Sequence, residues 1–126
     1  MSIPYRRNLA VFLEEFAAEH RGVRLGKMFG LPAVYAGRRL FACLIEGGVI
    51  VRLPDDAARR EIKAGARPFS RGGRTAAGPQ RRPLGSWVMY EPRTAAAARR
   101  LTPVLEIAAR HVARRQAEEL TGVKLA

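Results

Sequence analysis

The sequence has a single cysteine, two histidines and no apolar stretch that could cross a membrane. With Cys43 alone an intrachain disulfide is impossible, which fits a reducing compartment. The longest uninterrupted apolar run, Leu40–Ile45, is far shorter than the roughly 20 residues of a membrane span. The first residues do not have the pattern of a secretory signal. These absences predict a cytoplasmic protein with no membrane partner.

Residues suited to catalysis or metal binding are also scarce. His20 and His111 fall in two different expected helices and Cys43 in a strand, so no cluster of metal ligands is expected. His20 lies where a helix should end, a place that favours an imidazolium, and Cys43 is expected to fill core volume. No serine lies in a nucleophile-elbow pattern, and no phosphate-binding glycine loop is present. The sequence therefore predicts no catalytic residue, no metal and no cofactor.

Acidic residues are few compared with basic ones, 11 against 23, which gives a formal net charge of +12. Such an excess attracts phosphate backbones or acidic partners. Nearly all the basic residues are arginines, and arginine, alanine, glycine and proline share GC-rich codons. A bias toward such codons and selection for a binding surface are therefore two explanations of the charge, and the charge alone leaves both open.

The sequence does contain the pattern of one α+β domain over residues 1–126. An apolar stripe at helical spacing predicts a first helix over Tyr5–His20, which ends near Gly22. Short apolar runs then alternate with glycine-bearing turns, which is typical of an antiparallel meander. Its expected strands are Gly26–Gly30, Ala33–Tyr35, Leu40–Ile45 and Val49–Leu53. The third is apolar on both faces and is expected to be central.

Turn and cap signals divide the rest of the chain. Gly37 marks one turn of the meander, and Gly47-Gly48 marks a tight hairpin, since both positions of such a turn can need positive φ. Pro54-Asp55-Asp56 opens a second helix, which Gly65 ends. A fifth strand is expected over Ser86–Tyr90, with Trp87 and Met89 on one face and Val88 and Tyr90 on the other.

The C-terminal part is predicted to be helical in two pieces. Thr94 is expected to cap the first piece and Thr102 the second, with Pro103 at its first position. Glu106 and Arg110 have the spacing of a helical ion pair. The resulting order, α-β-β-β-β-α-β-α(-α), predicts helices packed on an antiparallel sheet of about five strands.

A set of short motifs resembles a known family. The motifs are Lys27-Met28-Phe29-Gly30, then Tyr35 and Gly37, then Phe41, Gly65, Pro68-Phe69 and Gly85-Ser86-Trp87-Val88. In this order and spacing they resemble the N-terminal domain of the TfoX (Sxy) competence regulators, as a stand-alone member. The chain departs from many relatives in having Leu31-Pro32 after Met-Phe-Gly instead of a second glycine. The resemblance implies an α+β module with a regulatory role linked to transcription, and it carries over no catalytic residue.

The main candidate site from the sequence is a basic, exposed loop over residues 70–83, rich in glycine, proline and arginine. Contact with an acidic partner or a nucleic acid is assigned to Arg67, Arg71, Arg74, Arg81 and Arg82. A merely solvated loop accounts for the same residues. The meander, in contrast, is interpreted as turns and core, with Phe29, Tyr35, Trp87 and Tyr90 packed against helices. Any of these aromatics left exposed would mark a partner surface, including that of a homodimer.

Three functions remain open from these residues. The first is a non-enzymatic regulatory or adaptor module that binds a macromolecular partner. The alternative is direct, mostly nonspecific nucleic-acid binding through the arginine loop and the last helix. The third is an unrecognised enzyme or small-ligand binder that uses a pocket between the first helix and the sheet.

Overall fold

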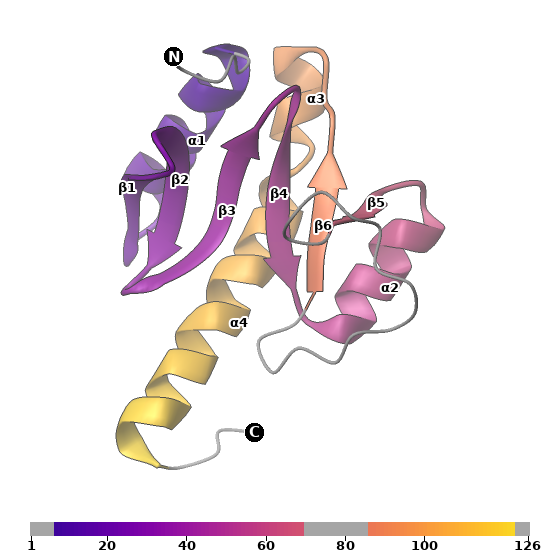
Figure 1. The fold of residues 1–126 in the computed structure, drawn as a ribbon. Coiled ribbons are helices and arrows are strands. Elements are labelled where there is room, and N and C mark those ends of the chain that lie inside the picture. Colours follow the sequence, from indigo (N-terminus) through magenta and orange to yellow (C-terminus); the bar gives the residue numbers. More distant parts are fainter. Residues whose placement is uncertain (1–6, 70–85, 123–126) are drawn as a thin grey trace.

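A computed structural model describes residues 7–69 and 86–122, and Figure 1 shows its ribbon. In chain order the elements are α1 (Arg7–Glu19), β1 (Val23–Met28), β2 (Leu31–Ala36), β3 (Arg39–Ile45), β4 (Gly48–Leu53), α2 (Asp55–Lys63), β5 (Arg67–Phe69), β6 (Ser86–Tyr90), α3 (Ala95–Arg99) and α4 (Thr102–Thr121). The predicted α+β architecture is confirmed.

The strands form one antiparallel sheet with the order β1-β2-β3-β4-β6-β5. β3 is an interior strand, as its two apolar faces predict, and β1 and β5 are the edges. The sheet has six strands where about five were expected, because Arg67-Pro68-Phe69 pairs with β6. Three residues are too few to show alternation, and a proline in a strand is tolerated at an edge.

The helices cover one face of the sheet and enclose the main core. Figure 1 shows α1, α3 and α4 behind the strands. From α1 this core takes Leu9, Leu13 and Phe16; from the sheet it takes Val34, Phe41, Leu44, Val49, Val51 and Val88; and from α4 it takes Leu105, Ala108 and Val112. α2 adds Ala57 and Ala58 on the same side, and the Tyr90 hydroxyl donates to Glu61 Oε1 of α2 at 2.7 Å. The expected packing of the first helix on the sheet is confirmed.

The opposite face of the sheet carries a smaller buried cluster of Ala33, Cys43, Ile50 and Trp87. Trp87 and Tyr35 were expected to pack against the helices, and this was wrong, because Tyr35 packs against this second cluster. Trp87 is part of the cluster itself. It lies on the other face because Val88 and Tyr90 of the same strand point toward the helices. The guanidinium carbon of Arg52 lies 4.7 Å from the centre of the Trp87 ring, and only 4% of Trp87 is exposed.

Several boundaries differ from those expected. The first strand is Val23–Met28, because Phe29 and Gly30 form the turn instead of ending the strand. Thr94 caps α3 as predicted, and its Oγ1 accepts from the amide of Ala97 at 3.0 Å. Thr102 does not cap α4. Leu101 takes the cap position, so that Thr102 and Pro103 both lie in the first turn of the helix.

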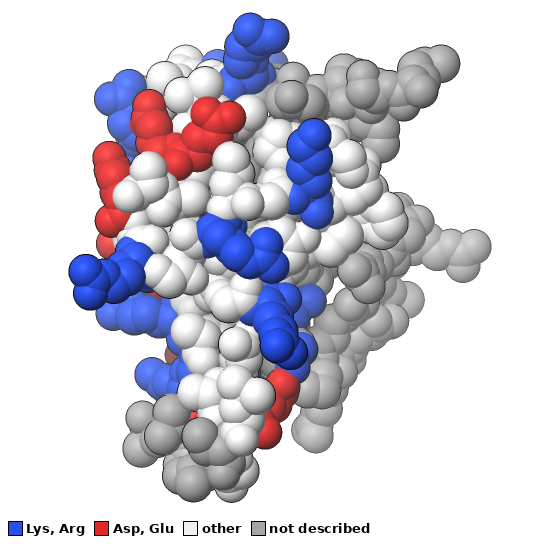
Figure 2. Space-filling model, turned by 90° about the vertical axis from the view of Figure 1, so that its left-hand side faces the viewer, with Lys and Arg blue, Asp and Glu red and all other residues white. Residues whose placement is uncertain are grey.

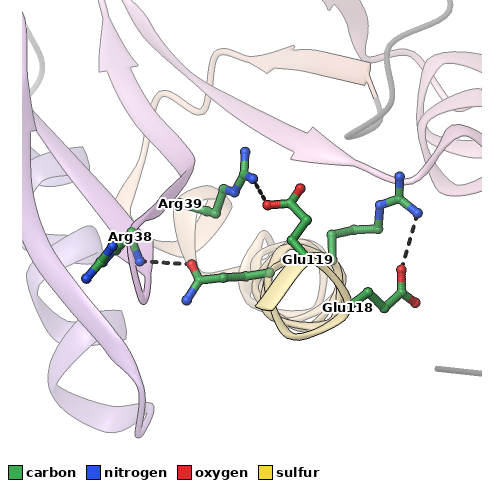
Figure 3. A network of polar contacts seen from close by, with 6 residues as sticks. Arg38, Arg39, Glu118 and Glu119 are labelled. Atoms are coloured by element: carbon green, nitrogen blue, oxygen red, sulfur yellow. Dashed lines mark hydrogen bonds and ion pairs between the residues drawn. The ribbon is translucent and has the colours of Figure 1, made fainter. Parts of the chain in front are cut away.

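The β2–β3 turn is attached to the end of α4 (Figure 3). Gly37 has the positive φ that a turn glycine was expected to supply. The amide of Arg38 donates to Gln116 Oε1 at 3.0 Å, and the Arg39 guanidinium pairs with the Glu119 carboxylate. Within the helix Arg115 contacts Glu118 at 3.4 Å. The contacts of Arg38 and Arg39 join the end of α4 to this turn. None of the helices in the described ranges has the length and apolarity needed to cross a membrane.

Candidate partner-binding site

The β1–β2 hairpin ends in a two-residue loop made of Phe29 and Gly30. Met28 pairs with Leu31, and the two loop residues have φ values of 53° and 79°. Positive φ at both positions is the signature of a type I′ turn, whose twist suits a hairpin. Asparagine or glycine normally occupies the first position, and here it is a phenylalanine. Across residues 7–69 and 86–122, Phe29 is the one non-glycine residue with a positive φ.

The side chain of Phe29 gains almost nothing from the fold. It is 84% exposed, whereas a packed aromatic ring would contribute a large area to a core. The left-handed conformation costs an L-residue with a bulky side chain about 1 kcal/mol. The expectation that Phe29 packs in the core was therefore wrong, since the turn directs its ring into solvent. A strained, exposed aromatic residue at a hairpin tip calls for a functional explanation.

The strand beside this tip is the exposed edge β1. Leu25 and Lys27 are exposed on it. The Tyr35 ring crosses β1 over Gly26, where an added Cβ would lie 2.9 Å from Tyr35 Cε1, and its hydroxyl donates to the carbonyl of Lys27 at 2.9 Å. The guanidinium carbon of Arg24 lies 4.4 Å from the centre of the same ring. Because one edge carbonyl is already bonded, β1 is poorly suited to pair with another strand along its full length.

Of the five arginines that the sequence assigned to contact with a partner, Arg67 lies among the described residues. It is on β5 with a largely exposed side chain, and its Nη1 lies 3.7 Å from Glu91 Oε1. The other four candidates (Arg71, Arg74, Arg81 and Arg82) and the loop 70–83 lie outside the described residues. On the side of the molecule drawn in Figure 2, basic side chains are scattered among uncharged ones and lie beside a group of acidic ones. The described arginines of that side do not form one continuous basic patch.

His20 links the end of α1 to α4. Its Nδ1 lies 2.9 Å from the carbonyl of Phe16 and its Nε2 lies 3.1 Å from Glu106 Oε2. Both partners accept hydrogen bonds, so only the imidazolium, with a hydrogen on each nitrogen, makes both contacts. The expected ion pair between Glu106 and Arg110 is not formed, because the Glu106 carboxylate is turned to His20 and Arg110 Nε donates to the Glu106 carbonyl at 3.4 Å.

This bond makes stability dependent on pH. The hydrogen bond to Glu106 raises the pKa of His20 above its ordinary 6.5, against a smaller opposing effect of burial. A raised folded-state pKa stabilises the fold fully below pH 6.5, and this contribution is lost as the pH rises through the folded-state pKa. Because the pair is partly exposed, we expect a loss of at most about 1 kcal/mol.

The pH effect is measured by urea denaturation at a series of pH values, together with an NMR titration of the His20 ring. We expect Glu106→Gln to lower the pKa of His20 and His20→Gln to remove the dependence. His111→Gln is the matched control and should retain it. A dependence that survives in His20→Gln would contradict the assignment.

The described residues do not assemble a metal site. Within residues 7–69 and 86–122, His, Cys, Asp and Glu side chains nowhere gather in groups of three or more that could hold an ion. Cys43 is buried in the sheet, as expected for a core residue. Asp55, at the start of α2, accepts a hydrogen bond from the Ser86 hydroxyl at 3.0 Å. The surroundings of Cys43 and Asp55 are thus structural.

Comparisons of the chain with family models, with curated proteins and with solved structures found no match in any of the three. The resemblance to the TfoX N-terminal domain stays a prediction. Its most compact motif, Lys27-Met28-Phe29-Gly30, forms the hairpin tip just described. Of the remaining residues of the resemblance, Gly37 and Gly65 have positive φ at the ends of β2 and α2, and Phe41 lies in the core.

Proposed function

We propose that this protein is a non-enzymatic adaptor module whose β1–β2 hairpin inserts Phe29 into a pocket of a partner protein. The observation that carries the proposal is Phe29 itself, 84% exposed at a positive φ on a hairpin fixed to a packed sheet. Aromatic side chains, phenylalanine included, are enriched at protein interfaces, and those with few rotatable bonds supply contact area at a low cost in entropy. A regulatory role linked to transcription, as the resemblance implies, is compatible with such an adaptor.

The chemistry around the tip specifies the partner. Lys27 and Leu25 are exposed beside Phe29, so the complementary surface is an apolar pocket edged by acidic side chains. The chain as a whole carries a charge of +12, which favours an acidic partner and opposes association with a second copy. Single-stranded nucleic acids often bind by stacking their bases on exposed aromatic rings. In this sheet Arg52 covers the Trp87 ring and Arg24 lies over the Tyr35 ring, so these faces are not open to a base.

A photo-crosslinking amino acid at position 29 tests the proposal in the native cell. We expect benzoylphenylalanine at this position to give one discrete crosslinked protein, which survives nuclease treatment and is acidic. The matched control places the same group at Leu120, which is 75% exposed near the end of α4 and away from the hairpin. The control should not capture that protein.

The outcomes separate the alternatives. The same pattern of products from both positions would overturn the proposal, as would products at position 29 that consist only of nucleic acid. The latter result would favour the nucleic-acid function instead. A product of twice the chain mass would identify a homodimer and contradict the acidic partner.

A further inference from the structure

A groove lies at the other end of β1, away from Phe29. It is bounded by the turn from α1 to β1, by the end of β2 and by one side of α4, and its volume is about 680 Å³. Its lining residues include His20, Arg21, Gly37, Glu106, Arg110 and Gln116. A volume of this size lies within the range of small-molecule sites. The sequence-based expectation of a pocket placed it between the first helix and the sheet, whereas α4 forms one of its walls.

Small side chains make the groove hollow. Ala109 and Ala113 are one turn apart on α4, and Ala36 faces them from the end of β2. The β2–β3 turn lies close to α4 at Gly37, where an added Cβ would lie 2.6 Å from Gln116 Nε2. The floor is therefore made of methyl groups, which suit a flat apolar body.

The rim of the groove is positively charged. While His20 is protonated, it and Glu106 neutralise one another through their hydrogen bond. Arg21 and Arg110 remain, both exposed, and neither guanidinium is ion-paired with a carboxylate in the described part of the chain. Gln116 accepts from the Arg38 amide through Oε1, and so its Nε2 keeps hydrogens to donate. The rim thus offers donors to an anion and no unpaired carboxylate that would repel it.

We propose that this groove binds a small organic anion, with its apolar body on the alanine floor and its carboxylate or phosphate group between Arg21 and Arg110. Two guanidinium groups match one anionic group, since each presents several donors in a fixed plane. The site is separate from the partner-binding hairpin, and neither proposal depends on the other.

The dye anilinonaphthalene sulfonate, an aromatic body with one anionic group, is the probe. We expect it to bind the folded protein at one site and to fluoresce there. The double variant Arg21→Glu/Arg110→Glu should weaken binding about tenfold or more, because a hydrogen-bonded charge contributes at least that much. Ala113→Phe fills the floor from an exposed position of α4 and should abolish binding. The neutral analogue phenylnaphthylamine should respond to Ala113→Phe and little to the charge variant.

The matched control Arg99→Glu/Arg114→Glu changes the net charge equally at two exposed residues that do not line the groove. It should leave the affinity nearly unchanged. An equal loss in this control would show general attraction to a basic protein, and dye binding to Ala113→Phe would place the dye elsewhere; either result overturns the proposal. Displacement by benzoate or by phenyl phosphate identifies the anionic group. Displacement by benzyl alcohol to the same degree would contradict the need for charge.

Discussion

Replacement of Phe29 by asparagine is expected to stabilise the fold and, at the same time, to weaken binding of the proposed partner protein. Asparagine tolerates positive φ and is a common first residue of a type I′ turn, so Phe29→Asn relieves the backbone strain. Almost no packing is lost, because the ring is 84% exposed. We expect the free energy of unfolding to rise by about 1 kcal/mol and the melting temperature by roughly 3–5 °C.

Binding should change in the opposite direction. Removing an aromatic anchor from the centre of an interface typically costs about 2 kcal/mol or more, which is roughly a thirtyfold loss of affinity. Thermal and urea denaturation measure the first effect, and titration with the partner identified by crosslinking measures the second. Phe29→Tyr is the control, since it retains both the strain and the ring. A loss of stability in Phe29→Asn would show that the ring supports the fold, and the functional assignment would then fail.

A gain in stability combined with a loss of affinity is informative, because most substitutions destabilise a protein. If replacing Phe29 improves folding, the phenylalanine side chain serves a purpose other than the fold. The same argument distinguishes Phe29 from Phe41, which is fully buried and whose truncation should only destabilise.

The strands of the meander were predictable because their signals are local. Alternating apolar residues and turn glycines predicted β2, β3 and β4, and the predicted ends differ from the observed ones by at most two residues. The face of the sheet on which Trp87 lies could not be predicted from the residues next to it in the sequence. It depends on the pairing of β6 with β4, and this pairing joins segments separated by α2. β5 was missed because its identity as a strand comes from its neighbour and not from its own sequence.

The exposure of Phe29 could have been inferred from the sequence in part. A glycine at position 30, followed by an apolar run, allows a two-residue loop that would place Phe29 at its first position. The alternative, a strand that continues through Phe29, has the better local propensity. The hairpin register decides between them, and register is set by burial on both strands. The groove had no comparable signal, since three separate parts of the chain form it.

The largest loss of stability from a single methyl group is expected at Gly48. The pair Gly47-Gly48 predicted a tight hairpin, whose turn positions can need positive φ; of the two glycines only Gly47 has it, at 79°. Gly48 is the first residue of β4, and it is restricted by space instead. An added Cβ would lie 2.5 Å from the backbone carbonyl oxygen of Tyr90, on the neighbouring strand. A backbone atom cannot rotate away as a flexible side chain can.

We therefore expect Gly48→Ala to cost roughly 3 kcal/mol or more, because β4 and β6 must separate where Val49 pairs with Tyr90. Gly47→Ala, with open space around the added atom, should cost only about 1 kcal/mol from backbone strain. Urea denaturation of the two variants measures the difference. Equal losses would mean that the sheet yields at this point. A larger loss at Gly48 would show that close approach of two strands, and not turn geometry, requires a glycine there.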